Sequence, residues 1–244
     1  METKALTIAI IAFLAGGMIG FLAANSLNRS EIDSIRAANS IPQPAQENAA
    51  LQEPALSDEE IRTRIRQADE TPNDLQYQRN LGVALYRYAS MKKNIPLLGE
   101  SARLLKRVLA AEPSNFDINV VLGNAYFDIG YFGQDSANFV EARRYYETAL
   151  SKNTGDAALR TDYGLTFFLQ QPSDYARALT EFEKALKSDP KNEKALEFTT
   201  QIYLKRGDAA NAQKTIDQLK FSNSTSPSIP GLTAELAAIS EPAR

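Results

Sequence analysis

The chain has 244 residues, a formal net charge of −3 at pH 7 and a sequence pI of about 5.3. This balance gives no basic footprint for nucleic acid, because Lys and Arg are interspersed with Asp and Glu. Histidine and cysteine are both absent, which removes the commonest general base, the thiol nucleophile and nearly all zinc and haem ligands. We therefore expect no enzyme activity, no metal and no cofactor, and a function based on binding.

A long apolar run follows the N-terminus. No residue between Lys4 and Arg29 is charged, and residues 5–24 are almost entirely apolar. Twenty helical residues extend about 30 Å, the thickness of the hydrocarbon core of a bilayer. A cleaved signal peptide is the alternative, but its apolar region is usually about 7–15 residues and ends in a small-x-small site; Leu22 stands where the first small residue is needed. The sequence predicts a transmembrane anchor over residues 1–28 that contacts the lipid bilayer through residues 5–24.

The orientation of this anchor is indicated only weakly by its flanking charges. Lys4 and the terminal amine precede the span, and Arg29 and Arg36 follow it, so the positive-inside rule is close to a tie. A long domain translocates with little regard for such charges. We expect a single-pass protein of a bacterial inner membrane with its main domain extracytoplasmic, and a cytoplasmic-facing domain is the alternative.

Gly16 and Gly20 form a G-x-x-x-G pair within the predicted span. Small residues at this spacing allow two membrane helices to pack closely. Two interpretations remain open: the pair supports transmembrane packing and a homodimer, or it reflects the ordinary glycine content of membrane helices.

The composition changes after the anchor. Residues 39–54 are rich in Pro, Gln, Asn and Ala and contain too little apolar surface to fold alone, so residues 29–56 are predicted to be a disordered linker, a flexible tether. Ser57 and Glu60 have the spacing of a capping box, which opens a helix. We expect residues 57–71 to form a capping helix, because the end of a stacked array needs a more polar cover.

A short sequence motif, called the phrase below, recurs four times in the next part of the chain. It reads Leu-Gly, Leu-Gly, Tyr-Gly and Thr-Thr, each followed three residues after the second position by a large apolar residue, and the first three copies are 41 residues apart. A fixed period in this range is typical of helical repeat arrays. Apolar residues downstream of each copy recur at spacings of three and four, as on one face of a second helix. The copies begin at Leu81, Leu122, Tyr163 and Thr199.

These residues resemble tetratricopeptide repeats. In that family a 34-residue helix-turn-helix unit carries L-G-x-x-Y on its first helix and A-x-x-x-F-x-x-A on its second, with a Pro before the next unit; Ala178, Phe182, Ala185 and Pro190 fit the second half. The resemblance implies an all-α fold with a right-handed array of helical hairpins over residues 72–221. About four repeats are expected, at about 72–113, 114–154, 155–190 and 191–221, with a loop and short helix at 222–244.

The first two repeats are longer than the family unit. About seven extra residues separate the phrase from the second-helix pattern in each, compared with the family spacing. We place these residues between the two helices, at Ser90–Leu98 and Gly130–Ala137, where they would form longer hairpin tips.

The resemblance also implies where a partner binds, on an inner groove lined by the first helix of each repeat. The residues that it assigns to this groove are Arg79, Val83, Tyr86, Val120, Asn124, Phe127, Thr161, Leu165, Phe168, Gln201 and Leu204. Three aromatic members of the set share one repeat position, with Leu204 continuing the row, and would form an apolar stripe. The stripe is either an anchor for a partner or part of the internal packing.

The functional expectation is a membrane-anchored adaptor. It would bind an apolar or amphipathic segment of another protein, and related single-span proteins act in envelope protein assembly and cytochrome c maturation. The alternative is a structural scaffold that self-associates, with its anchors dimerising through Gly16 and Gly20.

Overall fold

The computed structural model describes residues 57–240, which form an all-α array of helices. The predicted anchor with Gly16 and Gly20, and the predicted linker over 29–56, lie outside the described residues. Within 57–240 none of the helices is both long and apolar enough to cross a bilayer. The helices are α3 (Asp58–Glu70), α4 (Leu75–Lys92), α5 (Ile95–Ala111), α6 (Phe116–Gly133), α7 (Ser136–Lys152), α8 (Ala157–Leu169), α9 (Tyr175–Ser188), α10 (Glu193–Lys205), α11 (Ala209–Ser222) and α12 (Ile229–Ser240).

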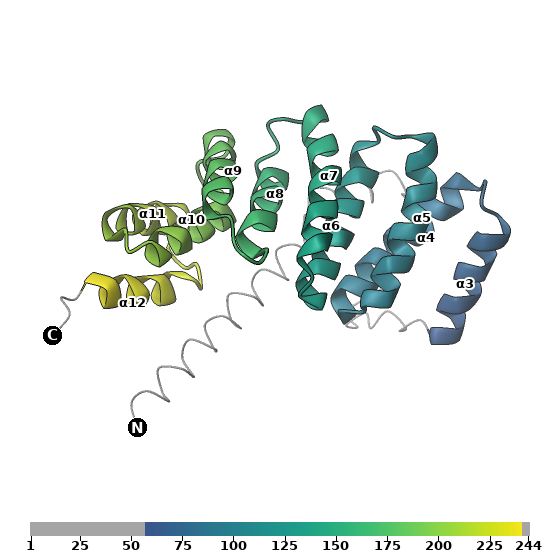
Figure 1. Cartoon of the computed structure of the whole chain (residues 1–244), viewed down its shortest axis with the longest axis horizontal. Coiled ribbons are helices and arrows are strands. Elements are labelled where there is room, and N and C mark those ends of the chain that lie inside the picture. Colours follow the sequence, from purple (N-terminus) through teal and green to yellow (C-terminus); the bar gives the residue numbers. More distant parts are fainter. Residues whose placement is uncertain (1–56, 241–244) are drawn as a thin grey trace, which may run out of the picture.

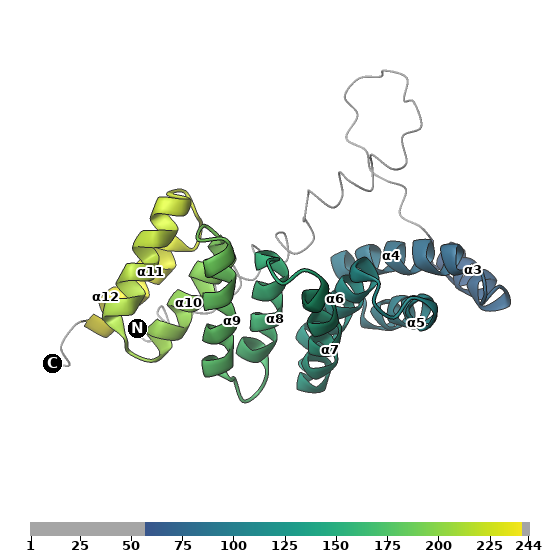
Figure 2. The same ribbon diagram turned by 90° about the horizontal axis from the view of Figure 1, so that it is seen from above.

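Helices that follow one another in sequence pack side by side, so the array runs in chain order from α3 to α12 (Figure 1). The tightest pairs are the hairpins α4–α5, α6–α7, α8–α9 and α10–α11. We call α4, α6, α8 and α10 the first helices and their partners the second helices. The four hairpins correspond to the four copies of the phrase, and the helical repeat array expected from the sequence is confirmed. Seen from above, the hairpins follow one another along the long axis of the molecule (Figure 2).

Short polar residues set where the helices begin. A Ser, Asp or Asn side chain accepts a hydrogen bond from a backbone N–H in the first turn of each helix from α3 to α11. Such caps satisfy backbone donors that have no partner within the helix. At α3 the predicted capping box is present, because the Ser57 N–H also donates to Glu60 Oε2 at 2.9 Å.

The extra residues of the first two repeats do not form the longer hairpin tips expected from the sequence, but lengthen the helices. Helices α4 and α6 have 18 residues and α5 and α7 have 17, whereas α8 to α11 have 13 or 14. The connections at 93–94 and 134–135 are only two residues long. Because a helical turn takes 3.6 residues, seven residues add about one turn to each helix and preserve the face that each presents.

The glycine of the phrase lies where the two helices of a hairpin approach most closely. A Cβ atom on Gly82 would lie 2.7 Å from Leu105 Cγ, and one on Gly164 would lie 2.7 Å from Phe182 Cε1. Gly123 faces the ring of Tyr146 in the same way. The second helix therefore packs a large side chain directly on the backbone of the first.

The fourth hairpin achieves a similar contact with different chemistry. Thr200 takes the glycine position, is fully buried, and donates from Oγ1 to Thr215 Oγ1 on α11 at 2.8 Å. Ile216, also fully buried, stands where the preceding repeats have Tyr146 and Phe182. The aliphatic side chain is smaller than an aromatic ring, which leaves room for the threonine.

We predict that Gly164→Ala destabilises the protein by about 1–3 kcal/mol, because the added methyl group must displace a fully buried ring. The matched control is Gly99→Ala on α5, where a Cβ meets no atom within 4 Å. That change should stabilise by about 0.5–1 kcal/mol, since Ala in a helix loses less backbone entropy than Gly. Urea denaturation followed by circular dichroism measures both; equal effects of the two substitutions would contradict the close contact at Gly164.

Candidate protein-binding surface

The four first helices form one continuous row along the array. Helix α4 contacts α6, α6 contacts α8 and α8 contacts α10, whereas successive second helices have no comparable contact. In a curved stack the row with the closer spacing lies on the inner side. The inner surface of the array is therefore made by α4, α6, α8 and α10, as the sequence resemblance implied.

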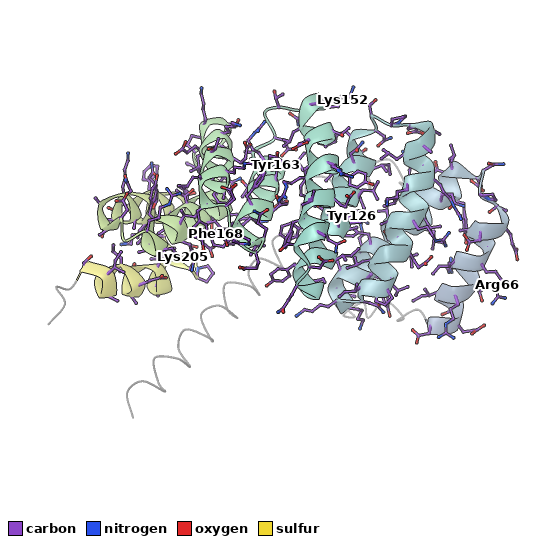
Figure 3. The ribbon with its side chains drawn as sticks, viewed as in Figure 1. Arg66, Tyr126, Lys152, Tyr163, Phe168 and Lys205 are labelled. Carbon is purple, nitrogen blue, oxygen red and sulfur yellow. The ribbon has the colours of Figure 1, made fainter. Side chains whose placement is uncertain are left out.

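Three of the four residues of the apolar stripe expected on this surface are packed inside the protein, whereas Tyr86 is half-buried. Phe127 is 1% exposed, Phe168 is 9% exposed and Leu204 is 3% exposed. Phe127 packs edge-on against Phe139 of α7, and Phe168 packs against Phe198 of α10, with ring centroids 5.4 and 5.1 Å apart. Figure 3 shows Phe168 near the end of α8 that faces the C-terminal helices. Of the two alternatives left open by the sequence, the structure shows internal packing for these three residues.

Two further residues assigned to the groove are also buried. Thr161 and Leu165 of α8 are both fully buried. Thr161 donates its hydroxyl proton to the carbonyl oxygen of Ala157, one turn earlier in the same helix, at 2.7 Å. These residues contribute to the stacking of repeats and do not offer a contact to a partner.

The other predicted groove residues keep part of their surface. Val83 and Val120 are half-buried, on α4 and α6. Arg79 pairs with Glu112 at 2.6 Å, and Gln201 donates to Glu197 Oε1 at 3.2 Å. Asn124 accepts a hydrogen bond from the Tyr146 hydroxyl at 2.8 Å, which joins α6 to α7. The accessible part of the inner surface is thus mixed: α4 and α6 carry the polar Arg79 and Asn124 beside their valines, and α10 carries polar side chains.

Sequence reasoning missed a polar network that links the first helices. Ser90 near the end of α4 donates to Asp128 Oδ2 on α6 at 2.6 Å. Lys194 on α10 donates to Asp162 Oδ1 on α8 at 3.0 Å, in an ion pair whose side chains are 20% and 14% exposed. A usable signal was present, since Asp128 is a carboxylate within an otherwise apolar stretch of α6. The network places carboxylates along the inner row, between side chains that pack the repeats together.

Burial changes the acidity of this network. Loss of solvent raises the pKa of Asp128 to about 7, partly opposed by the hydrogen bond from Ser90. Burial also raises the pKa of Asp162, against the attraction of Lys194, and raises the pKa of Glu197 on α10. The hydroxyl of Tyr86 has its pKa raised well above the usual value by burial and by the charges of Asp128 and Asp162.

Aromatic residues of the phrase lie elsewhere, between successive second helices. Tyr126 stacks on Tyr145 of α7 with centroids 5.6 Å apart, and the ammonium of Lys106 on α5 lies 5.0 Å from its ring centroid. In the next repeat Arg143 lies 4.5 Å from the ring centroid of Phe167. Figure 3 labels Tyr126 on α6 and Tyr163 on α8. These cation and aromatic contacts join one hairpin to the next.

The described residues contain no candidate metal centre. Over residues 57–240 no three His, Cys, Asp or Glu side chains are grouped closely enough to hold a metal ion.

Two family models match the chain, both described as tetratricopeptide repeat. They cover residues 134–193 and 169–236. Together these ranges run from the start of α7 into α12. A comparison with curated protein sequences found no match.

Solved structures share the fold of the array. A MamA protein matches with a TM-score of 0.53 and 18% identity, covering 68% of this chain and 81% of its own. The C-terminal part of a repeat protein from Cytophaga hutchinsonii gives 0.55 and 16%, covering 71% and 65%. A thermophilic repeat protein of Thermus thermophilus gives 0.50 and 18%, covering 75% and 89%. Residues 134–236 therefore match models of tetratricopeptide repeats, whose proteins mediate protein–protein interactions, and the solved structures show that the array has the same fold.

Proposed function

We propose that this protein is a non-enzymatic, membrane-anchored adaptor that holds a segment of another protein on the inner surface of its array. The observation that carries this proposal is the composition of that surface. Val83 and Val120 keep exposed aliphatic surface, and carboxylates lie further along the same row of helices. A row of parallel helices with repeated side-chain positions suits an extended or helical segment better than a small molecule.

The chemistry of the surface specifies the partner segment. Aliphatic contacts at α4 and α6 favour an apolar stretch, and Asp162 and Glu197 at α8 and α10 favour a cationic one. Lys194 offsets part of the acidic charge through its ion pair with Asp162. An amphipathic segment with apolar residues at one end and Lys or Arg at the other fits both halves. The proposed ligand is therefore a cationic amphipathic segment that binds in one orientation along the row of helices.

The anchor is the second part of the proposal. Residues 5–24 form an apolar run long enough to span a bilayer once, and we place the array on the extracytoplasmic side of a bacterial inner membrane. An adaptor in that position would recruit proteins to the membrane surface, as in envelope protein assembly or cytochrome c maturation. The fold alone does not choose among such processes, so the partner must be identified directly.

The buried carboxyl of Asp128 makes the stability of the folded protein depend on pH. The pKa of Asp128 is about 7 in the folded protein and about 4 in an unfolded chain. Between these values the folded state binds a proton that the unfolded state does not. The resulting contribution to stability is fully present below about pH 4 and is lost as the pH rises through about 7.

We predict that the pair Val83→Lys and Val120→Lys lowers the capture of partner proteins about tenfold, because each change removes an apolar contact and places a charge against the apolar part of the segment. The matched control is Val140→Lys on α7, where the valine is 43% exposed on a second helix. Crosslinking in native membranes followed by mass spectrometry measures capture, and circular dichroism checks that each variant is folded. Equal capture by the inner-surface pair and the control would refute the assignment of the inner surface.

We also predict that Asp128→Asn makes the protein more stable at pH 8 by about 2 kcal/mol, because it removes a buried charge while keeping an oxygen that accepts from Ser90. The gain should shrink as the pH falls to 5, where the native carboxyl is already protonated. Urea denaturation across this pH range measures the difference. Asp117→Asn, at an exposed position at the other end of α6, should not reproduce it. A gain that does not vary with pH would show that folding does not raise the pKa of Asp128.

A further inference from the structure

The first end of the array carries an apolar groove that the inner surface does not use. It has a volume of about 380 Å³ and lies between α3 and α4. Helix α4 lines it with side chains spaced three and four residues apart, which is one face of the helix, and α3 contributes Ile61 and Arg64. The lining residues of α4 include Tyr77, Leu81, Ala84, Leu85 and Tyr88.

This face of α4 is covered in every later repeat. Ala84 occupies the repeat position of Ala125, Thr166 and Ile202, counted from the phrase. Those three residues are fully buried, whereas Ala84 is exposed. In the later repeats the preceding hairpin supplies both a second helix and a first helix as neighbours. Beside α4, helix α3 takes the place of the preceding second helix. No helix within residues 57–240 takes the place of the preceding first helix.

We propose that residues 44–56 of this chain occupy the groove, in the place that a first helix takes before its second helix. Leu51 and Leu56 would supply the large apolar contacts. The described chain begins at Ser57, which caps α3 four residues before Ile61 of the groove lining. Leu56 directly precedes the cap and Ile61 follows it by four residues, the spacing at which two apolar residues pack across a helix start.

The composition of the segment is compatible with a helix that is shorter than the first helices of the array, which have 13 to 18 residues. Pro44 and Pro54 bound a stretch of Ala, Gln, Glu, Asn and Leu without an internal proline, and proline is tolerated in the first turn but not beyond it. A helix that ends at Glu53 leaves residues 54–57 as its connection to α3. The connections between the helices of the other hairpins are two to five residues long.

Charge and proximity favour the same segment over a separate partner. Glu47 and Glu53 are acidic, and Arg64 lies at the groove. Because the segment is joined to α3, its local concentration at the groove is in the millimolar range without any further contact. Residues 39–54 carry too little apolar surface to fold alone, and the groove supplies the surface that they lack. Docking would shorten the tether and leave the inner surface as the site for partners.

The absence of cysteine from the chain allows a direct test. In the full-length protein in lipid bilayers, Ala50→Cys is combined with Ala84→Cys in the groove and treated with a short bismaleimide. The matched control combines Ala50→Cys with Thr63→Cys, an exposed position on α3 that is outside the groove lining and closer to residue 50 in sequence. A docked segment should crosslink to residue 84 about tenfold faster than to residue 63, within one chain. Replacing Leu51 and Leu56 together by Ser should abolish that preference.

Three results would overturn the proposal. Equal rates for the two pairs would mean that residues 44–56 do not prefer the groove. A crosslink between two chains would assign the groove to a second copy of the protein. Faster crosslinking of Ile35→Cys to Ala84→Cys than of Ala50→Cys would assign it to an earlier segment of the chain.

Discussion

The close approach of the two helices within each hairpin is the contact on which the array depends. At Gly82, Gly123 and Gly164 the absence of a Cβ lets a large side chain of the second helix lie on the backbone of the first. Contacts of this kind are stabilised by many small dispersion terms, and they are weakened if the helices separate by a fraction of an ångström. Because each hairpin repeats the same approach, a residue's place in the repeat determines its environment. The comparison of Ala84 with its buried counterparts rests on this equivalence.

The sequence predicted the hairpins well, because the spacing of apolar residues and the phrase both follow from that contact. It did not show whether the extra residues of the first two repeats lengthen loops or helices. The spacing of two motifs counts the residues between them but does not give their conformation. Continued helix pairs their backbone groups internally, whereas a long loop would leave those groups to water or side chains. Asn94 and Asp135 supplied a local signal, since each caps the helix that follows.

The prediction that the residues assigned by the resemblance line an accessible groove was correct for only some of them, and the reason is physical. A rule that assigns groove positions from repeat phase assumes that neighbouring hairpins leave that phase uncovered. Here Phe127 packs on Phe139 within its own hairpin, and Phe168 packs on Phe198 of the next hairpin, so both rings are internal. Tyr86 shares their repeat position but lies beside Asp128 and Asp162. The position of a residue within the repeat places it in a row along the first helices. The side chains packed around it then determine whether it is exposed.

The acidic network on the inner row is costly for a structural element. A buried carboxyl whose pKa rises to about 7 opposes folding at neutral pH, and an amide or an apolar side chain could fill the same space without this cost. The hydrogen bond from Ser90 on α4 to Asp128 on α6 could also be received by a neutral acceptor. Sites where a chain departs from the locally most stable choice are where function is best sought. The carboxylates lie on the row of helices that the array presents inward, while the apolar groove lies at its first end.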